Sequence, residues 1–388
     1  MLWIGAFFSF LGSWVQNVAQ GWLVYELTGD EAKLAFVTFC GMVPVSLLGP
    51  FAGSLVDTFN KRRVLIACQA VFSASAIFLA IATANGFVQY WHILLVALVN
   101  GLASTIEMPA RQSIVSRVVP AEDLPAAVPL NAMTFNLSRL LGPAIGAVLL
   151  ARFGPQACYT MNGVSYLALI LAASAIRADL SAVKRDPEPI GDLLFEGMRY
   201  TFQDARLKTL FFMEATVSCF GLFYLALMPA IAKKMLGTNE YGLGTAMSAI
   251  GVGTITSLLI LTALSGRKIK AQLVGWSMAV MGTGLFCLGF ARSIWVAAPL
   301  LAITGGAAIM QFNTTNTLFQ LLSPERLRGR VLAMHVWALS GLGPPGVIFF
   351  GWLAREASIP ITLHIGGICV IIGAAWGYFN RSTLVGVD

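Results

Sequence analysis

Long runs of apolar residues separated by short polar segments dominate the pattern of this chain. A helix needs about 20 mostly apolar residues to cross the roughly 30 Å hydrocarbon core of a bilayer. Backbone N–H and C=O groups in lipid must be satisfied within the segment, so these runs are predicted to be helices. Twelve spans are expected, near residues 2–25, 34–56, 64–84, 93–113, 128–151, 157–177, 207–232, 242–265, 270–291, 295–317, 331–353 and 358–379.

Composition favours a protein embedded in the lipid bilayer over a soluble domain. Charged residues make up 11% of the 388 positions and hydrophobic residues 57%, whereas soluble domains carry roughly 25% charged residues. The net charge of +7 resides in short loops between apolar runs. Membrane topology accounts for that charge, so no nucleic-acid partner is expected.

The cysteines, histidines and short motifs of the chain do not indicate a metal site or a catalytic site. The six cysteines stand apart without a CxxC pair, and the three histidines are dispersed. Neither a disulfide framework nor a zinc site is predicted. The motifs GxxxxGK[ST], HExxH and GxSxG do not occur. We therefore expect no metal, no cofactor and no enzymatic activity.

The distribution of basic residues predicts the orientation of the chain. With a cytoplasmic N-terminus, 18 of the 25 Lys and Arg residues fall in predicted cytoplasmic segments and six fall outside, while Arg139 lies within a span. Basic residues are enriched in cytoplasmic loops. Both termini are therefore expected in the cytoplasm, with the protein in the cytoplasmic (inner) membrane of a bacterium.

The longest polar stretch divides the chain into two groups of six spans. It runs from residue 178 to 206 and separates a bundle over 1–177 from a bundle over 207–380, which a cytoplasmic tail, 381–388, follows. Within this linker, Ile190, Leu193, Leu194 and Met198 recur at helical spacing. The pattern predicts a short amphipathic helix on the inner membrane surface.

The two groups of spans resemble each other at matching places. Pro120 follows the fourth span and Pro324 follows the tenth, 204 positions later. The fifth span then contains Gly142-Pro143 and the eleventh contains Gly343-Pro344. Two matches in order favour a duplicated six-helix unit, which in transporters frames a substrate site at mid-membrane depth.

The loop after the second span combines one acid with three bases. It contains Gly53, Asp57, Lys61, Arg62 and Arg63. Asp57 is expected to cap the third span or to pair with a base, and Asn60 to tolerate a left-handed turn. The bases are expected at the anionic inner surface of the membrane.

At these residues the chain resembles the major facilitator superfamily, whose corresponding loop has the pattern G-x-L-x-D-R-x-G-R-R/K. It departs from that pattern at Thr58 and Asn60. The resemblance implies two six-helix bundles related by a pseudo-twofold axis, and a gating role for this loop. The segments around Glu107 and Asn136 resemble the bacterial twelve-span drug and siderophore exporters, including the enterobactin-exporter-like and macrolide-efflux-like proteins. The elements Gly142, Pro143 and Gly146 resemble the G-P-x-x-G element of the fifth span in exporters.

Three ionisable residues fall inside predicted spans: Glu107, Arg139 and Glu214. Such groups are costly in lipid and are functional candidates by default. Glu107 and Arg139 lie at similar depths in adjacent spans. Glu107 or Glu214 is expected to exchange a proton during transport, with Arg139 modulating the acid; a structural ion pair is the alternative.

Amide and aromatic side chains gather on the spans that line the cavity in this superfamily. A largely apolar cavity with a few amides suits amphiphilic small molecules; helix-to-helix hydrogen bonding is the alternative for each residue. The cavity candidates are Gln16, Gln20, Asn100, Asn136, Tyr224, Gln311, Asn313 and Trp337.

These features predict a secondary active transporter, a monomer that moves a drug or siderophore out of the cell in exchange for protons by alternating access. An importer or a lipid flippase of the same fold is the alternative. A membrane-embedded enzyme or a receptor would need clustered ligands or a large soluble output domain, and the sequence indicates neither.

Overall fold

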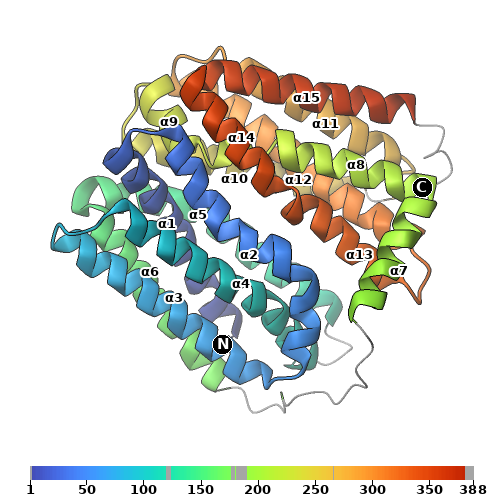
Figure 1. Ribbon diagram of the computed structural model, residues 1–388, viewed down its shortest axis with the longest axis horizontal. Helices are drawn as coiled ribbons and strands as arrows, with labels where there is room; N and C mark the ends of the chain where they lie inside the picture. The colour runs from blue at the N-terminus through green and yellow to red at the C-terminus, as the bar shows by residue number, and fades with distance from the viewer. Residues whose placement is uncertain (1, 119–123, 176–179, 181–189, 265, 381–388) are drawn as a thin grey trace. The chain divides into compact units, whose positions relative to one another are not determined.

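The computed structural model describes residues 2–118, 124–175, 180, 190–264 and 266–380, and every regular element in them is helical (Figure 1). The first half contains α1 (Leu2–Thr28), α2 (Glu31–Asp57), α3 (Lys61–Ala84), α4 (Tyr90–Val118), α5 (Leu124–Phe153) and α6 (Pro155–Ser174). The second half contains α7 (Ile190–Gln203), α8 (Ala205–Phe220), η1 (Phe223–Leu225), α9 (Met228–Ala230), η2 (Ile231–Met235), α10 (Glu240–Ala263), α11 (Lys270–Leu288), α12 (Ile294–Leu322), α13 (Arg328–Val336), η3 (Trp337–Gly341), α14 (Gly343–Glu356) and α15 (Ile359–Phe379).

Eleven helical segments among the described residues are long and apolar enough to cross a membrane. They correspond to the second to twelfth predicted spans. The first span is the 27-residue helix α1, whose Gln16, Asn17 and Gln20 lower its hydropathy. The prediction of an all-α membrane protein is confirmed.

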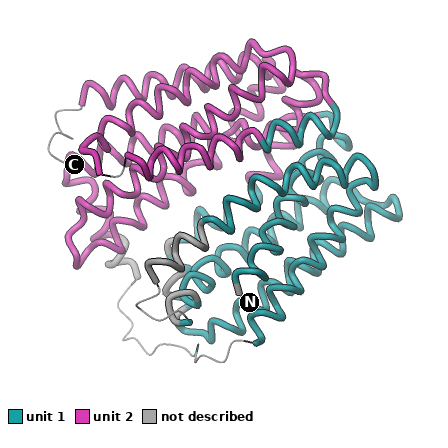
Figure 2. The backbone as a smooth tube through the Cα atoms, turned by 180° about the vertical axis from the view of Figure 1, so that it is seen from behind, with its two compact units in different colours: residues 1–29, 40–186, 239–248 teal, residues 30–39, 187–238, 249–388 magenta. Residues whose placement is uncertain are grey.

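The chain groups into two compact units (Figure 2). Unit 1 comprises residues 1–29, 40–186 and 239–248, and unit 2 comprises residues 30–39, 187–238 and 249–388. The start of α2 therefore belongs with the second half of the chain, and the start of α10 with the first. The predicted domain boundaries do not include this exchange, and much of the predicted linker and the tail 381–388 lies outside the described residues.

Two predicted spans are interrupted helices. The seventh span ends its α-helix at Phe220 and continues through the short elements η1, α9 and η2. The eleventh consists of α13 and α14, separated by the π-helical turn η3. Hydropathy alone predicts one continuous helix in each case, because it reports length and polarity rather than hydrogen-bond pattern. Broken helices are tolerated in membrane proteins where neighbouring helices satisfy the freed backbone groups.

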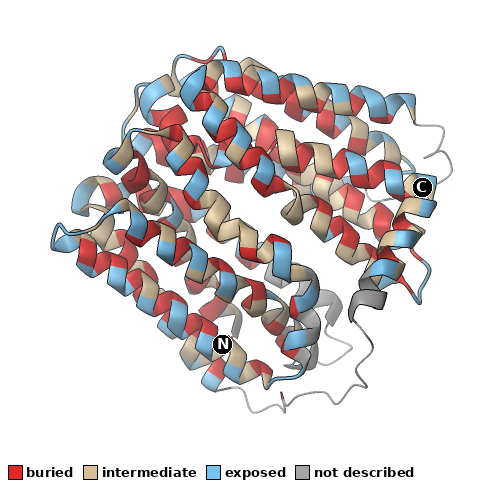
Figure 3. Ribbon diagram, in the orientation of Figure 1, coloured by how far each residue is buried: buried red, intermediate tan, exposed pale blue. Residues whose placement is uncertain are grey.

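Most helices bury one face and expose apolar residues on the other (Figure 3). Leu171 is 71% exposed and Trp295 is 82% exposed. A water-soluble protein rarely exposes large apolar residues in number. Lipid is the solvent that makes these faces favourable.

Candidate functional site

In unit 1, Glu107 on α4 lies in a buried polar cluster that joins three helices. Its Oε1 accepts a hydrogen bond from Nε2 of Gln69 on α3 at 3.3 Å, and Oε1 of Gln69 accepts one from Oγ of Ser9 on α1 at 3.3 Å. Arg111 Nε lies 3.3 Å from the same Glu107 oxygen, and its guanidinium lies 4.1 Å from the centre of the Phe10 ring. Glu107 is thus an acid with a charge partner one helical turn away.

A second network in unit 1 joins α1 to α6. Asn162 Nδ2 donates to Gln16 Oε1 at 2.6 Å and also lies 3.1 Å from the Tyr166 hydroxyl. That hydroxyl is 3.1 Å from Oγ of Ser13. The cavity candidate Gln16 therefore lies between two packed helices, where its amide bonds helix to helix.

In unit 2, Glu214 on α8 is completely buried beside Gln311 on α12. Gln311 Nε2 donates to Glu214 Oε2 at 2.8 Å and lies 3.2 Å from the Thr315 hydroxyl. The other oxygen of Glu214 and the amide oxygen of Gln311 are buried without a hydrogen-bond partner. Across the described residues, no basic side chain forms an ion pair with Glu214. This acid differs from Glu107 in having no neighbouring cation to offset its charge.

The two acidic clusters occupy related places in the repeat. Glu107 and Gln311 are 204 positions apart, the same offset that separates Pro120 from Pro324. In the first half the fourth span supplies the acid. In the second half the tenth span supplies an amide at that position, and the acid is on the seventh span. The duplicated units therefore keep a polar contact at this level but differ in which helix carries the charge.

The interruption of the eleventh span contacts α8 one turn beyond Glu214, and the interruption of the seventh span begins at Gly221, seven residues beyond Glu214. Ser218, one turn further along α8, donates from its hydroxyl to the Leu339 carbonyl within the π-helical turn η3. The Trp337 ring at the start of η3 lies 5.9 Å from the Phe211 ring, and Tyr224 lies buried in η1. A π-helical turn often marks a functional position in a helix.

His335 is a buried residue that is not among the candidates predicted from the sequence. It is fully buried on α13, and neither ring nitrogen has a hydrogen-bond partner. Its ring stacks on Phe312 at 5.1 Å and packs against Phe319 at 5.3 Å. The sequence does not show whether a single histidine in an apolar span is buried, because hydropathy is averaged over many residues and one residue changes the average little.

The remaining candidates are less buried. The Arg139 guanidinium lies 5.7 Å from the centre of the Trp14 ring. Asn313 Nδ2 donates to the Ile309 carbonyl of its own helix at 2.9 Å. Gln20, Asn100 and Asn136 are half-buried in unit 1. Their roles in a cavity, and that of Arg139 beside an acid, stay predictions.

The helix α3, which follows the proposed gating loop, is capped by Asn60. Asn60 is the N-cap of α3, and its side-chain oxygen accepts from the backbone N–H groups of Arg62 at 3.1 Å and Arg63 at 3.2 Å. Its φ is −69°, so the expected left-handed turn is wrong: the capping residue adopts an extended conformation instead. Lys61 is fully buried, and its N–H donates to the Leu180 carbonyl at 3.0 Å. The Asp57 side chain lies outside the described part of the structure, so the gating role of Gly53 and Asp57 stays a prediction.

The start of α8 has a similar cap. Asp204 Oδ1 accepts from the backbone N–H groups of Arg206 at 2.8 Å and Leu207 at 3.4 Å. The hydrogen bonds from the Arg206 side chain hold the pKa of the Asp204 carboxyl below its usual range. The cap remains charged, and therefore effective, well into mildly acidic solution.

The two glycines of the fifth-span element are contact points with α1. A Cβ atom at Gly142 would lie 2.4 Å from Trp14 Cβ, and one at Gly146 would lie 3.1 Å from Val15 Cα. Glycine permits this close approach of two helices. Pro143, between them, is also buried.

Gly142→Ala is therefore expected to destabilise the protein, because the added methyl group overlaps Trp14. Overpacking of this kind costs about 1–3 kcal/mol. The matched control is Gly275→Ala on α11, where a Cβ meets nothing within 4 Å. Thermal unfolding in detergent checks this: a lower melting temperature is expected for Gly142→Ala alone, and equal melting temperatures for both variants would contradict the assignment.

At its first turn, α2 is tied to elements of the second half within unit 2. Lys234 Nζ in η2 lies 2.8 Å from Oε1 of Glu31, whose side chain is only 2% exposed. Asp30 Oδ2 lies 3.7 Å from Arg355 NH1 on α14. A Cβ at Gly351 would lie 2.2 Å from Ala35 Cβ. Ion pairs and small residues together hold α2 against α14 and η2.

Unit 1 contains the counterpart of this contact. The first part of α10 packs against α5, where a Cβ at Gly244 would lie 2.3 Å from Ala147 Cβ. The Ser248 hydroxyl donates to the Leu140 carbonyl at 3.3 Å. The second and eighth spans, equivalent in the repeat, thus each begin against a helix of the opposite half.

The chain belongs to the transmembrane secretion effector family of the major facilitator superfamily, whose family model matches residues 1–385. It is similar to the staphyloferrin A transporter of Staphylococcus aureus, with 24% identity over 97% of this chain and 94% of the relative. It is 23% identical to the multidrug efflux pump Tap of Mycobacterium tuberculosis, covering 90% and 85%. It is 21% identical to the macrolide efflux protein A of Streptococcus pyogenes, covering 95% and 92%.

Solved structures confirm the fold. A bacterial homologue of the lysosomal transporter Spinster has a TM-score of 0.79 at 14% identity, covering all of this chain and 97% of that one. The nucleoside transporter NupG has a TM-score of 0.78 at 14% identity, covering 99% and 98%. The predicted superfamily and exporter branch are therefore confirmed, and the family and fold are those of membrane transporters.

Proposed function

We propose that this protein is a proton-coupled exporter of amphiphilic small molecules that works by alternating access in a bacterial cytoplasmic membrane, with both termini in the cytoplasm. The threefold excess of basic residues in the predicted cytoplasmic segments supports this orientation. The relatives that are named for efflux of drugs and macrolides support the direction of transport.

The Glu214 cluster is the observation that supports proton coupling. An ionised carboxylate in apolar surroundings is costly unless it is paired. Glu214 has an amide donor on one oxygen and no partner on the other. Proton uptake removes that cost, and proton release restores it, so the group is suited to load and unload one proton. Glu107, already paired with Arg111, is better suited to fixing α4 against α1 and α3.

The surroundings of Glu214 support the proposed substrate class. Phe211, one turn before Glu214 on α8, and the Trp337 ring packed against it supply aromatic surface, while Gln311 and Thr315 supply a few polar groups. Such a mixture suits solutes with an apolar body and a small polar or cationic part. A cationic amphiphile would bind when Glu214 is charged and leave when Glu214 takes up a proton. The proton and the cationic substrate therefore compete for one carboxylate. This competition is the simplest basis for exchange of substrate for protons.

Alternating access requires contacts that open and close. The pairs Glu31–Lys234 and Asp30–Arg355 lie at the end of α2 that the proposed orientation places outside the membrane. We assign them as the contacts that hold the outer end closed, and the loop containing Asp57 as the corresponding element at the cytoplasmic end.

Transport into inverted membrane vesicles tests the proposal. A fluorescent cationic amphiphile is expected to accumulate inside vesicles containing the protein when their interior is acidic, and an uncoupler is expected to stop the accumulation. Vesicles without the protein are the control. Accumulation that continues at the same rate after the gradient has collapsed would reject proton coupling.

A further inference from the structure

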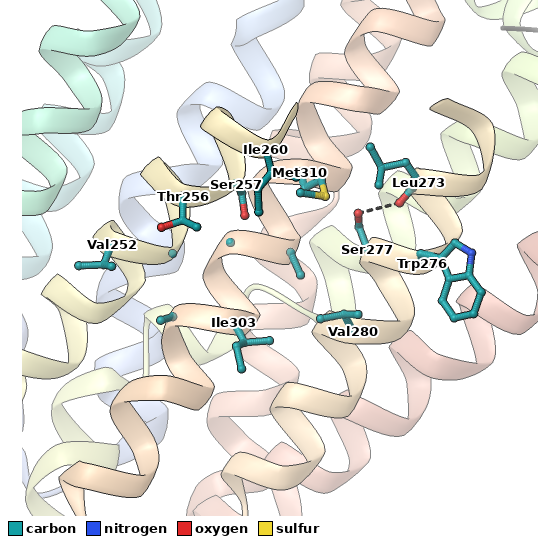
Figure 4. Close-up of a pocket in the computed structure, with 14 residues that line it drawn as sticks. Val252, Thr256, Ser257, Ile260, Leu273, Trp276, Ser277, Val280, Ile303 and Met310 are labelled. Carbon is teal, nitrogen blue, oxygen red and sulfur yellow. Dashed lines mark hydrogen bonds between the residues drawn. The ribbon is translucent and has the colours of Figure 1, made fainter. Parts of the chain in front are cut away.

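A groove in unit 2 lies between α10, α11 and α12, and Glu214 on α8 is not among the residues that line it. It encloses a volume of about 450 Å³ (Figure 4). Its walls are almost entirely apolar and include Val252, Ile260, Trp276, Val280 and Ile303. Each of these five side chains is more than two-fifths exposed. The groove therefore opens sideways from the bundle, toward the lipid that surrounds these helices.

Small residues on α10 and α12 create the groove. A Cβ at Gly253 would lie 1.8 Å from the Ala302 carbonyl oxygen, and one at Gly306 would lie 2.6 Å from Ser257 Oγ. The two helices approach so closely there that no large side chain covers the seam. On the opposite wall, Ser277 turns its hydroxyl back to the Leu273 carbonyl of its own helix at 2.6 Å (Figure 4). The floor of the groove consequently offers an apolar surface with few free polar groups.

One end of the groove meets a cluster of bases. Arg267 and Lys268 are exposed in the turn between α10 and α11, and Lys270 begins α11. The chain contains no Asp or Glu between Tyr241 and Pro324, so the acid that these three helices carry is Glu240, at the opposite end of α10 from the bases. In the proposed orientation this turn is on the cytoplasmic side. It then lies at the level of the headgroups of the inner leaflet, where anionic lipids attract Lys and Arg.

The dimensions of the groove match one leaflet. From Lys270 to Val280, α11 rises about 15 Å at 1.5 Å per residue. The hydrocarbon core is about 30 Å thick, so this is about the depth of one leaflet. Trp276 lies between the two levels and is 68% exposed. A soluble ligand would need polar groups along this length, whereas an acyl chain needs none.

We infer that this groove binds an anionic phospholipid of the inner leaflet, with an acyl chain between α10, α11 and α12 and its phosphate at Arg267, Lys268 and Lys270. The inference rests on the proposed function for the cytoplasmic location of the turn, but it concerns a site separate from Glu214. Occupancy fills the uncovered seam between α10 and α12, so a bound lipid is expected to stabilise the second half of the chain.

Native mass spectrometry and thermal unfolding of the detergent-purified protein test this inference with phosphatidylglycerol and phosphatidylcholine of equal chain length. The wild type is expected to retain phosphatidylglycerol in preference to phosphatidylcholine and to melt at a higher temperature with it. Arg267→Gln/Lys268→Gln is expected to remove the preference, whereas Lys208→Gln, at an exposed lysine on α8, is expected to keep it. Glycerol phosphate, which has no acyl chain, is expected to have no effect.

A groove-filling variant separates acyl binding from surface charge. Val280→Trp fills the groove while the bases remain, and it is expected to abolish the retained lipid. Val296→Trp on α12 places the same side chain at another exposed position outside the groove and is expected to bind lipid normally. Equal binding by both tryptophan variants, or equal stabilisation by glycerol phosphate and phosphatidylglycerol, would overturn the inference. Neither readout needs a proton gradient, so a failure here is distinct from a failure of proton coupling.

Discussion

Glu214→Gln is expected to abolish the part of transport that depends on the proton gradient. The amide keeps the size of the side chain and can still bond Gln311, but it cannot gain or lose a proton. Accumulation in inverted vesicles should fall to the level measured without a gradient. Exchange of labelled for unlabelled substrate, which needs no net proton movement, should continue.

Two variants provide controls for this result. Glu214→Asp keeps a carboxyl group and is expected to retain gradient dependence at a reduced rate. Glu107→Gln removes the acid that is paired with Arg111. It is expected to lower thermal stability and to leave the dependence of transport on the proton gradient unchanged. If Glu107→Gln lost that response and Glu214→Gln kept it, the roles of the two acids would be reversed.

Reversing one charge of the Glu31–Lys234 pair is expected to lower the rate of efflux strongly. Glu31→Lys places two cations together where the native side chains lie 2.8 Å apart. Breaking a fully buried pair costs about 3–5 kcal/mol. The cost here lies below that, because the Lys234 side chain is 56% exposed. The closed outer end loses stability, so the rate of efflux should fall strongly.

The double variant Glu31→Lys/Lys234→Glu restores opposite charges and is expected to recover much of the transport rate. Glu26→Lys changes an exposed acid near the end of α1 and serves as the charge-matched control. Initial efflux rates of all four proteins, at equal amounts in the membrane, provide the comparison. Failure of the double variant to exceed Glu31→Lys would show that the pair is not an electrostatic contact of the transport cycle.

The positions of the spans were predictable because lipid imposes a simple requirement on every segment that crosses it. A run of apolar residues of sufficient length suffices, and the structure places helices at those runs. The breaks after Phe220 and at Trp337 were not predictable from hydropathy. They depend on hydrogen bonds across helices, such as that from Ser218 to Leu339, which no local pattern records.

In the candidate site, too, local sequence predicted the burial of the acids but not their hydrogen-bond partners. Burial of Glu107 and Glu214 followed from their positions inside apolar runs. Their partners did not, because they depend on how each helix is rotated about its axis. Gln69 on α3 bonds Glu107 in the interior, and Arg111 lies closer to the membrane end yet reaches back one turn to the same acid.

A further difference concerns capping. Asp57 was expected either to cap the third span or to pair with a base, but Asn60, three residues further along the chain, is the residue that caps α3. The boundary of a helix decides which residue caps it, and hydropathy locates such boundaries only within a few residues.

Substrate-evoked proton movement tests proton exchange most directly. Inverted vesicles are acidified, a pH-sensitive dye reports their interior, and a cationic amphiphile is then added outside. The wild type is predicted to release protons from the interior as the amphiphile enters, and Glu214→Gln is predicted to release none. Uptake of the amphiphile by the wild type with no change in interior pH would contradict the account.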